Sequence, residues 1–264
     1  MAINSGDFKL RLVDKPKQVY ISERNCAVQA NAIIPATYDK QINTEIKLIY
    51  RGAQTARILS YEPGDYLFAC DTTLRHEYDK LTKTDSWRLV TYNPIELVDE
   101  NFCPYNNVIL FGRIAKDIDP NNSMDLKYIN DLIICNRSIV CSVAPQQGEF
   151  FNIFAVNKVD SPSYNLAQNL ADQYPKGTNV VIKGVLVTDG WIDKNTKEQK
   201  TNTKIKLLSI NKAYVNTDNN AVNTYVSNKK QESLVMTGDS STVTITADTM
   251  PRWSPTENNE EVPF

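Results

Sequence analysis

Residues 150–214 have the sequence FFNIFAVNKVDSPSYNLAQNLADQYPKGTNVVIKGVLVTDGWIDKNTKEQKTNTKIKLLSINKAY. Apolar residues follow a period of about two in 150–156, 180–188 and 204–214, which is typical of β-strands. Between the first two segments, Leu166, Leu170 and Tyr174 share one face of a helix expected over 164–174, and Pro175-Lys176-Gly177 ends it. A hairpin turn at 193–197 joins the last two strands. This region is therefore predicted to fold as strand, helix, strand, strand.

Two further strands are predicted upstream of this region. The near-continuous apolar run at 108–114 indicates a strand that is buried on both faces, and 131–135 forms another strand after the turn-rich loop at 117–123. Three strands, a helix and two strands are the order of an OB-fold barrel. The sequence thus predicts an all-β fold with one short helix per barrel.

A weaker copy of this pattern lies in the first part of the chain. Pro63-Gly64-Asp65 and the apolar strand after it resemble Lys176-Gly177-Thr178 and its strand, and later segments keep a nearly constant offset. Chance similarity between two β-hairpins is the alternative explanation. Two barrels of about 100 residues account for the length without an overlong loop. We therefore expect two tandem OB-fold barrels, an N-terminal one at 1–100 and a C-terminal one at 105–215.

The remaining segment, 216–264, is rich in Asn, Thr and Ser and contains three Lys or Arg against seven Asp or Glu. Such a composition cannot bury enough apolar surface to offset the entropy of ordering, so a disordered acidic tail is predicted. It ends in Glu260, Glu261, Val262, Pro263 and Phe264. Carboxylates beside a terminal aromatic ring are typical of a peptide that docks on a partner protein. The alternative is an acidic terminus that happens to end in Phe.

Charge and motif content favour binding over catalysis. The chain carries a net charge of −2, but the acidic tail accounts for it, and the folded part is slightly basic, which suits contact with a polyanion. His76 is the chain's one histidine, so a His-rich metal site or a His dyad is excluded. This side chain is expected at the surface. Neither a phosphate-binding loop nor a dinucleotide motif is present, although the pattern leaves a carboxylate-only metal site open. We expect no enzyme activity, no catalytic residues, no cofactor and no metal.

The sequence also bears on location. The segment Met1-Ala2-Ile3-Asn4 does not begin a signal peptide, and no apolar run approaches the ~18 residues of a membrane span. The five Cys are odd in number and form no Cys-x-x-Cys pair, so they are expected to be small buried residues in a reducing compartment. A cytoplasmic protein without a membrane association is expected.

Several motifs together resemble one protein family. They are the strand at 106–114, Asn136-Arg137, the block at 176–184, Trp191-Ile192-Asp193 and the tip at 260–264. In this order they resemble bacterial single-stranded DNA-binding proteins. With the internal repeat, the chain is similar to the branch of that family with two OB-folds per chain.

This resemblance implies a function and its partners. It implies sequence-independent binding and protection of single-stranded DNA in replication, recombination and repair, in a nucleoid-associated protein. Members of the branch are dimers that present four OB-folds, so a homodimer is expected. The tip is expected to recruit replication and repair proteins.

The resemblance also implies site residues. In the second barrel, Trp191 and Phe150 match base-stacking positions, whereas Phe151 points to the opposite face and is expected in the core. The expected phosphate contacts are Arg113, Arg137, Lys183 and, with less support, Lys194. In the first barrel, composition and the repeat indicate Tyr78, Trp87 and Arg88, with Trp87 alternatively a core residue.

Two departures from the family pattern predict weaker binding than in relatives. Asp189-Gly190 precede Trp191 where the family has a basic residue, and Val156 replaces a strand aromatic. Two rival functions stay open on the sequence alone: an OB-fold adaptor that binds mainly protein, and an RNA-binding OB protein.

Overall fold

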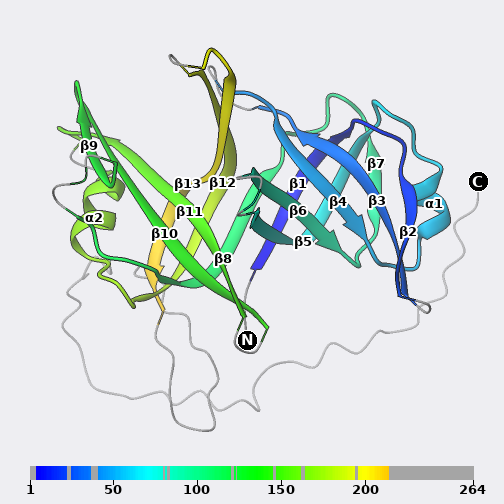
Figure 1. Ribbon diagram of the computed structural model, residues 1–264, viewed down its shortest axis with the longest axis horizontal. Coiled ribbons are helices and arrows are strands. Elements are labelled where there is room, and N and C mark those ends of the chain that lie inside the picture. The colour runs from blue at the N-terminus through cyan, green and yellow to red at the C-terminus, as the bar shows by residue number, and fades with distance from the viewer. Residues whose placement is uncertain are drawn as a thin grey trace, which may run out of the picture. The chain divides into compact units, whose positions relative to one another are not determined.

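The computed structural model describes residues 4–22, 25–36, 41–79, 81, 84–119, 122, 124–144, 147–161, 164–193 and 196–213. The predicted tail at 216–264 and Lys194 lie outside these residues. The described elements are predominantly β-strands, arranged as two tandem OB-fold barrels (Figure 1).

The second barrel follows the predicted order of elements. It comprises β8 (Asn106–Ile114), β9 (Leu126–Ile129), β10 (Leu132–Ala144), β11 (Gln147–Lys158), α2 (Leu166–Asp172), β12 (Asn179–Ile192) and β13 (Gln199–Lys212). The strands, the helix and the hairpin are confirmed. The short strand β9 was not predicted, because it has only four residues and owes its conformation to antiparallel pairing with β10.

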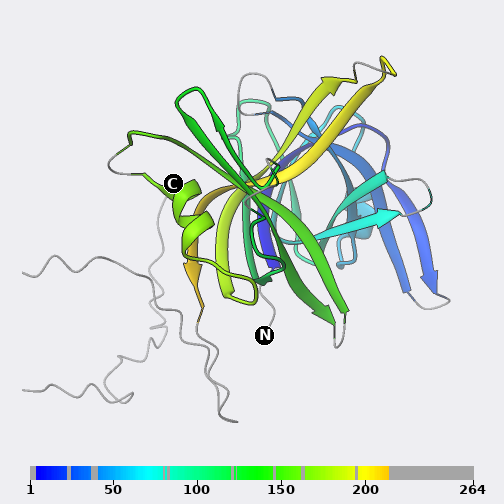
Figure 2. The ribbon, with the colours of Figure 1, turned by 60° about the vertical axis from the view of Figure 1, so that its left-hand side comes forward.

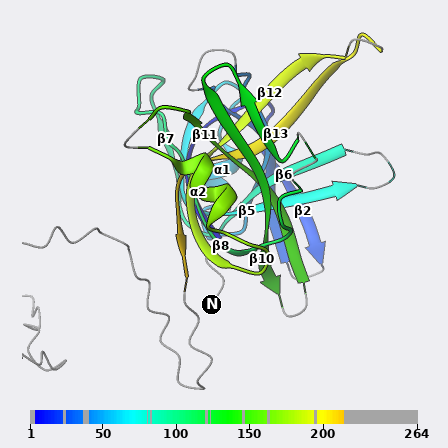
Figure 3. The same cartoon turned by 90° about the vertical axis from the view of Figure 1, so that its left-hand side faces the viewer.

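The first barrel repeats this order in the first part of the chain. It comprises β1 (Asn4–Leu12), β2 (Lys17–Ser22), β3 (Asn25–Ile34), β4 (Thr44–Tyr50), α1 (Thr55–Leu59), β5 (Tyr66–Asp79), β6 (Thr84–Thr91) and an added strand, β7 (Ile95–Val98). Parallel pairing closes each barrel, between β4 and β6 in the first and between β11 and β13 in the second. Figures 2 and 3 show the β12–β13 hairpin, in yellow, and the β5–β6 hairpin, in cyan, extending beyond the barrels.

Matching hydrogen bonds identify equivalent positions in the two barrels. The side-chain amide of Asn4 exchanges hydrogen bonds with the main chain of Leu74, at 2.6 and 2.9 Å. Asn106 does the same with Leu186, at 2.7 and 2.9 Å. These bonds tie the opening strand of each barrel to its fourth long strand. The internal repeat is therefore structural and not a chance similarity between hairpins.

The glycines that suggested the repeat occupy the same special conformation. Gly64 has φ +97° and Gly177 has φ +87°, in the left-handed region that favours glycine. Each lies in the turn that follows the helix and leads into a long strand. The resemblance of Pro63-Gly64-Asp65 to Lys176-Gly177-Thr178 thus reflects one shared turn requirement.

The two barrels are joined edge to edge by β1 and β8. These strands pair in antiparallel fashion from Asn4–Leu110 to Phe8–Asn106, so the two barrels share one continuous sheet (Figure 1). Apolar side chains on the inner faces, such as Phe8, Leu10 and Leu110, are fully buried. The buried side chains of both barrels belong to one continuous hydrophobic core, so packing as well as the β1–β8 ladder joins the barrels.

Neither described helix has the length and apolar character that a membrane crossing needs. The five Cys are all unbridged. Burial raises the pKa of the Cys135 and Cys141 thiols to about 11 and about 12, as expected for core residues. Cys26 and Cys103 are exposed, because they lie at a strand end and in a loop, so the expectation of burial is wrong for these two.

Candidate nucleic-acid interface

Strand β11 presents two aromatic rings on its outer face. Phe151 and Ile153 are fully buried, and strand alternation turns Phe150 and Phe154 to the opposite side. Phe150 is 58% exposed, and Phe154 is half-buried. Phe150 was predicted from the sequence as an outward ring, and Phe154 was not. The period of two that places Phe151 in the core also places Phe154 beside Phe150.

Arg113 of β8 lies in the same cross-strand row as Phe150. The register pairs Arg113 with Val140 of β10, and Val140 with Phe150 of β11. Two strand spacings of ~4.8 Å put the Arg113 and Phe150 backbones about 10 Å apart on one surface. Arg113 is exposed, with its Nε 3.4 Å from Asn179 Oδ1. An exposed guanidinium and an exposed aromatic ring thus share one surface of the second barrel.

Lysines of β13 border the second ring. Phe154 pairs with Asn136 on one side and with Lys206 on the other. Lys204 donates from Nζ to Asn136 Oδ1 at 3.2 Å. Burial lowers the pKa of Lys204, Asp189 opposes this shift, and Lys127 adds to it. Phe154 therefore lies between an asparagine on β10 and a lysine on β13, with Lys204 close by.

Arg137 does not belong to this outer surface. It is only 3% exposed and donates to the carbonyl oxygens of Lys116, Tyr174 and Leu170, at 2.7, 2.9 and 3.3 Å. Burial also lowers its pKa. The prediction of a phosphate contact is wrong for this residue, because its guanidinium is used inside the barrel to hold the end of α2 against β10.

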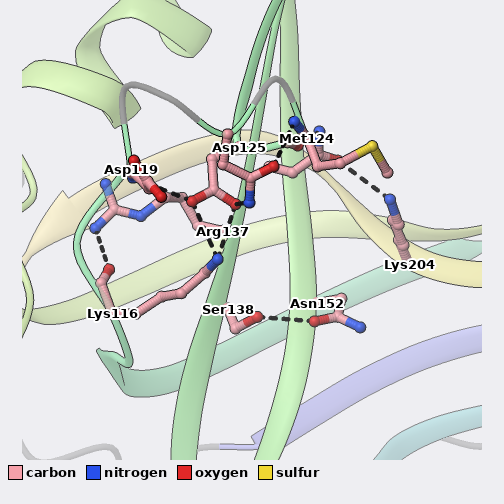
Figure 4. A network of polar contacts seen from close by, with 10 residues as sticks. Lys116, Asp119, Met124, Asp125, Arg137, Ser138, Asn152 and Lys204 are labelled. Carbon is pink, nitrogen blue, oxygen red and sulfur yellow. Dashed lines mark hydrogen bonds and ion pairs between the residues drawn. The ribbon is translucent and has the colours of Figure 1, made fainter.

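A polar network lies just above Arg137 (Figure 4). Asp125 is 5% exposed and accepts from Lys116 Nζ at 2.8 and 3.0 Å and from the Asp119 amide at 3.2 Å. Burial alone would raise the pKa of Asp125, but these donors, with the nearby Arg137 charge, outweigh it and lower the pKa. Lys116 and Asp119 are thereby tied to Asp125, which immediately precedes β9.

Trp191 lies on the β12–β13 hairpin, away from β11. Its ring is 47% exposed, and Lys200 pairs with it across the hairpin. Lys200 donates to Asp193 Oδ2 at 2.6 Å. Trp191 and Lys200 line a groove of about 500 Å³, whose other wall includes Glu45, Thr84 and Asp85 of the first barrel. The predicted stacking tryptophan thus opens onto the junction between the barrels.

Lys183 is not brought to either aromatic position. It is exposed on β12, between Ile109 of β8 and Ser209 of β13. It precedes Trp191 on the same strand by roughly 26 Å, at ~3.3 Å per residue. Lys183 shares the outer face of the sheet with Arg113, because its partner Ile109 lies four residues before Arg113 on β8, a distance of roughly 13 Å along the strand.

The chain resembles known proteins both in sequence and in fold. Residues 105–212 match the Single-strand binding protein family. The resemblance to bacterial-type single-stranded DNA-binding proteins is confirmed. No curated protein matches the chain.

Two solved structures of single-stranded DNA-binding protein from Thermus aquaticus are similar to the whole two-barrel arrangement. The wild-type protein gives a TM-score of 0.58 at 17% identity and covers 80% of this chain and 93% of its own. A deletion mutant gives 0.56 at 17% identity, with 80% and 94% covered. At this identity the likeness shows the fold alone. The family match over residues 105–212 supports single-stranded DNA binding.

Within this single-strand binding fold, the first barrel lacks the aromatic pair of the second. The registers of its strands place Glu45 where the second barrel has Phe150, and Ile49 where it has Phe154. Arg88 donates to Glu77 at 2.6 Å, and Tyr78 is 52% exposed near the end of β5. Arg88 and Tyr78 therefore have no pair of outward aromatic rings on β4 comparable to Phe150 and Phe154 on β11.

Trp87 corrects a second prediction. It is 6% exposed and packs in the core with its ring centroid 6.0 Å from that of Phe151. Its position on the inner face of β6 leaves no face for a base. The core alternative holds for this residue. In the part of the chain that the structure describes, no group of three His, Cys, Asp or Glu side chains could hold a metal ion.

Proposed function

We propose that this protein binds and protects single-stranded DNA, with little sequence preference, in replication, recombination and repair. The observation that carries the proposal is the pair of outward rings on β11, Phe150 and Phe154, flanked by Arg113 on one side and Lys206 on the other. Successive bases stack on such rings whatever their identity, because every base has a π-face.

The charges around the rings explain how the backbone is held. Arg113 and the lysines of β13 neutralise phosphates and release their counterions, so that affinity falls as salt rises. The main chain of the barrel is already hydrogen-bonded within the sheet, which leaves side chains to make the contacts. A surface of this kind recognises single strands by stacking and charge and not by base edges.

The second barrel is the stronger binder in this proposal. Its outer face has two rings, whereas Glu45 and Ile49 hold the equivalent places in the first barrel. A carboxylate repels phosphate, and an isoleucine offers no π-face. Tyr78 and Arg88 remain proposed DNA contacts of the first barrel, and Trp191 with Lys200 provides a path from one barrel to the other.

A titration of fluorescein-labelled oligo(dT), followed by anisotropy, tests the function. The rival functions are tested by the same assay with oligo(U). Binding of oligo(dT) with little dependence on base composition supports the proposal. Preference for oligo(U) would indicate an RNA-binding protein, and no binding of either would indicate an adaptor that binds protein.

We also propose that the chain forms a homodimer with four barrels. The outer face of the sheet that joins the barrels carries Ile109, Phe111 and Val181, all half-buried in the single chain. A second copy would cover these apolar side chains. Light scattering at micromolar concentration is expected to give two copies, and one or four copies would contradict the dimer.

The tip Glu260–Phe264 is proposed to recruit replication and repair proteins in the cytoplasm, at the nucleoid. In this proposal the chain is divided into the two barrels, 1–100 and 105–215, and the acidic segment 216–264. Support comes from the charge asymmetry of the sequence and from the terminal ring beside carboxylates.

A further inference from the structure

His76 links the first barrel to the strand of the second barrel that carries Phe150. Its Nδ1 lies 2.7 Å from the Phe150 carbonyl oxygen, and its Nε2 lies 2.7 Å from Asp85 Oδ1. A main-chain carbonyl oxygen only accepts, so Nδ1 is the donor in the bond to Phe150. The imidazole is 9% exposed, with its ring centroid 4.4 Å from that of Trp87. The expectation of a surface histidine is wrong, because the second barrel covers this side chain.

The residue next to Phe150 is held by the same strand of the first barrel. The main-chain amide of His76 donates to Glu149 Oε2 at 3.2 Å, and Arg75 donates to Glu149 Oε1 at 2.6 Å. The Glu149 side chain is 14% exposed, so this ion pair is largely shielded from water. Two consecutive residues of β11 are therefore attached to β5.

This attachment lies where β11 has one strand neighbour. β10 pairs along this part of β11, whereas the recorded pairing with β13 is at Ile153 and Phe154. The β10–β11 ladder is also irregular between Ser142 and Ala144, near the end of the hairpin. On the side away from β10, the first barrel supplies the hydrogen bond that a neighbouring strand would otherwise supply to the Phe150 carbonyl.

We propose that His76 is a positioning residue for base stacking: it fixes the main chain of Phe150, so that the first barrel sets the stacking geometry of the second. The proposal rests on the proposed function of Phe150. A ring on an anchored strand is already ordered before DNA arrives, so a base that stacks on it meets a smaller entropic cost. The first barrel would thus contribute to affinity without an aromatic pair of its own.

Substitutions of His76 separate positioning from general stability. His76→Leu keeps a similar volume but loses the donor, whereas His76→Asn keeps a donor near the position of Nδ1. We expect His76→Leu to weaken oligo(dT) binding about tenfold, the effect of ordering roughly one residue, and His76→Asn to restore most of it. Anisotropy of labelled oligo(dT) is the readout, because Trp87 contacts His76 and its fluorescence would change in the free protein.

The decisive measurement is the double substitution with Phe150→Ala. If His76 acts through Phe150, His76→Leu has no further effect once the ring is gone. An equal loss in both backgrounds, or no loss in either, would overturn the proposal. Failure of the unaltered protein to bind oligo(dT) would contradict the proposed function. Unchanged binding in Phe150→Ala would contradict the proposed site, and in either case the role of His76 would be contradicted too.

Thr44→Val provides a matched control at another contact between the barrels. Thr44 Oγ1 lies 2.8 Å from Thr188 Oγ1, and Thr44 is 2% exposed. This substitution removes a buried inter-barrel hydrogen bond of similar length but leaves the Phe150 end of β11 untouched. The Phe150-dependent part of the affinity is expected to be unchanged. Its loss in Thr44→Val would show that any loosening of the junction has the same effect and would contradict a specific role for His76.

Discussion

Gly6 of β1 and Val108 of β8 lie opposite each other at the centre of the ladder that joins the two barrels. On one side of them Asn4 pairs with Leu110, and on the other Phe8 pairs with Asn106. Because Asn4 and Asn106 are equivalent positions, the two sides are related by a local two-fold axis through the Gly6–Val108 pair. The chain therefore builds, within one polypeptide, an arrangement with the symmetry of a dimer of barrels.

This symmetry makes the differences between equivalent positions informative. Glu45 of the first barrel occupies the position that Phe150 has in the second. His76 of the first barrel bonds to β11 of the second, whereas at the related contact Thr188 of the second barrel bonds to Thr44 on β4 of the first. The two halves share a backbone plan but not a binding surface.

Alanine at Phe150, Phe154 or Trp191 is expected to weaken oligo(dT) binding by roughly 1–3 kcal/mol for each ring that stacks a base. The measurement is the dissociation constant by anisotropy, with the fold checked by circular dichroism. Tyr92→Ala, which removes a ring that is 64% exposed on the first barrel, is the control and is expected to bind like the unaltered protein. Full affinity in the Phe150→Ala, Phe154→Ala double variant would refute the assignment of β11.

Arg113 and Arg137 are expected to behave in opposite ways, although both matched phosphate positions in sequence. Arg113→Ala is expected to reduce the slope of log affinity against log salt by about 0.7, the loss of one phosphate contact. Arg137→Met is expected to leave that slope unchanged and to lower the free energy of unfolding by at least ~2 kcal/mol, because three internal carbonyls lose their donor. Salt titrations and urea unfolding of both variants test this pair. A shallower slope in Arg137→Met would restore it as a phosphate contact.

Trp87→Ala is expected to destabilise the first barrel by about 3–5 kcal/mol, as the loss of a large core side chain does. Thermal and urea unfolding measure the change. The DNA affinity of the folded molecules is expected to fall no further than in His76→Leu, because Trp87 affects binding only through its contact with His76. A variant of unchanged stability and lost binding would mean that Trp87 stacks a base after all.

Acid stability is expected to depend on Asp125. The pKa of this carboxyl is lowered in the folded state, so its contribution is present above the unfolded pKa of ~3.9 and is lost as the pH falls through the lower folded value. Asp125→Asn is therefore expected to be less stable than the unaltered protein near pH 7, with the difference shrinking below about pH 4. Urea unfolding between pH 3 and 7 tests it, with Asp160→Asn on an exposed turn as the control. A difference that grows toward low pH would contradict the sign of the shift.

Removal of Phe264 is expected to leave DNA affinity unchanged and to abolish recovery of replication and repair proteins from host extract. The ring contributes up to ~2–3 kcal/mol when it is buried in a partner's pocket. Deletion of 257–264 is expected to raise DNA affinity slightly at low salt, because an acidic segment competes for basic surfaces. Recovery of the same proteins with and without Phe264 would show that the tip is not a docking peptide.

Local signals in the sequence were sufficient for the architecture. The period of two in 150–156 and 180–188, the helix before Pro175 and the glycine turns at Gly64 and Gly177 each depend on residues close in the chain. The same period identifies Phe150 as an outward ring and would have identified Phe154. Residue motifs also sufficed for the family resemblance, because they lie within single strands and turns.

The placement of side chains between strands was decided by the tertiary structure alone. Arg137 is on a motif that resembles a phosphate contact, yet its guanidinium is satisfied by carbonyls from α2 and from the segment after β8, which no local pattern brings together. His76 looked like a surface residue because its immediate sequence neighbours do not cover it; the rings that pack on it are Trp87, its partner across the β5–β6 hairpin, and Phe151 of the other barrel. Periodicity specifies which face of a strand a residue occupies. What lies against that face depends on strand register and barrel closure, which are set by contacts between distant parts of the chain.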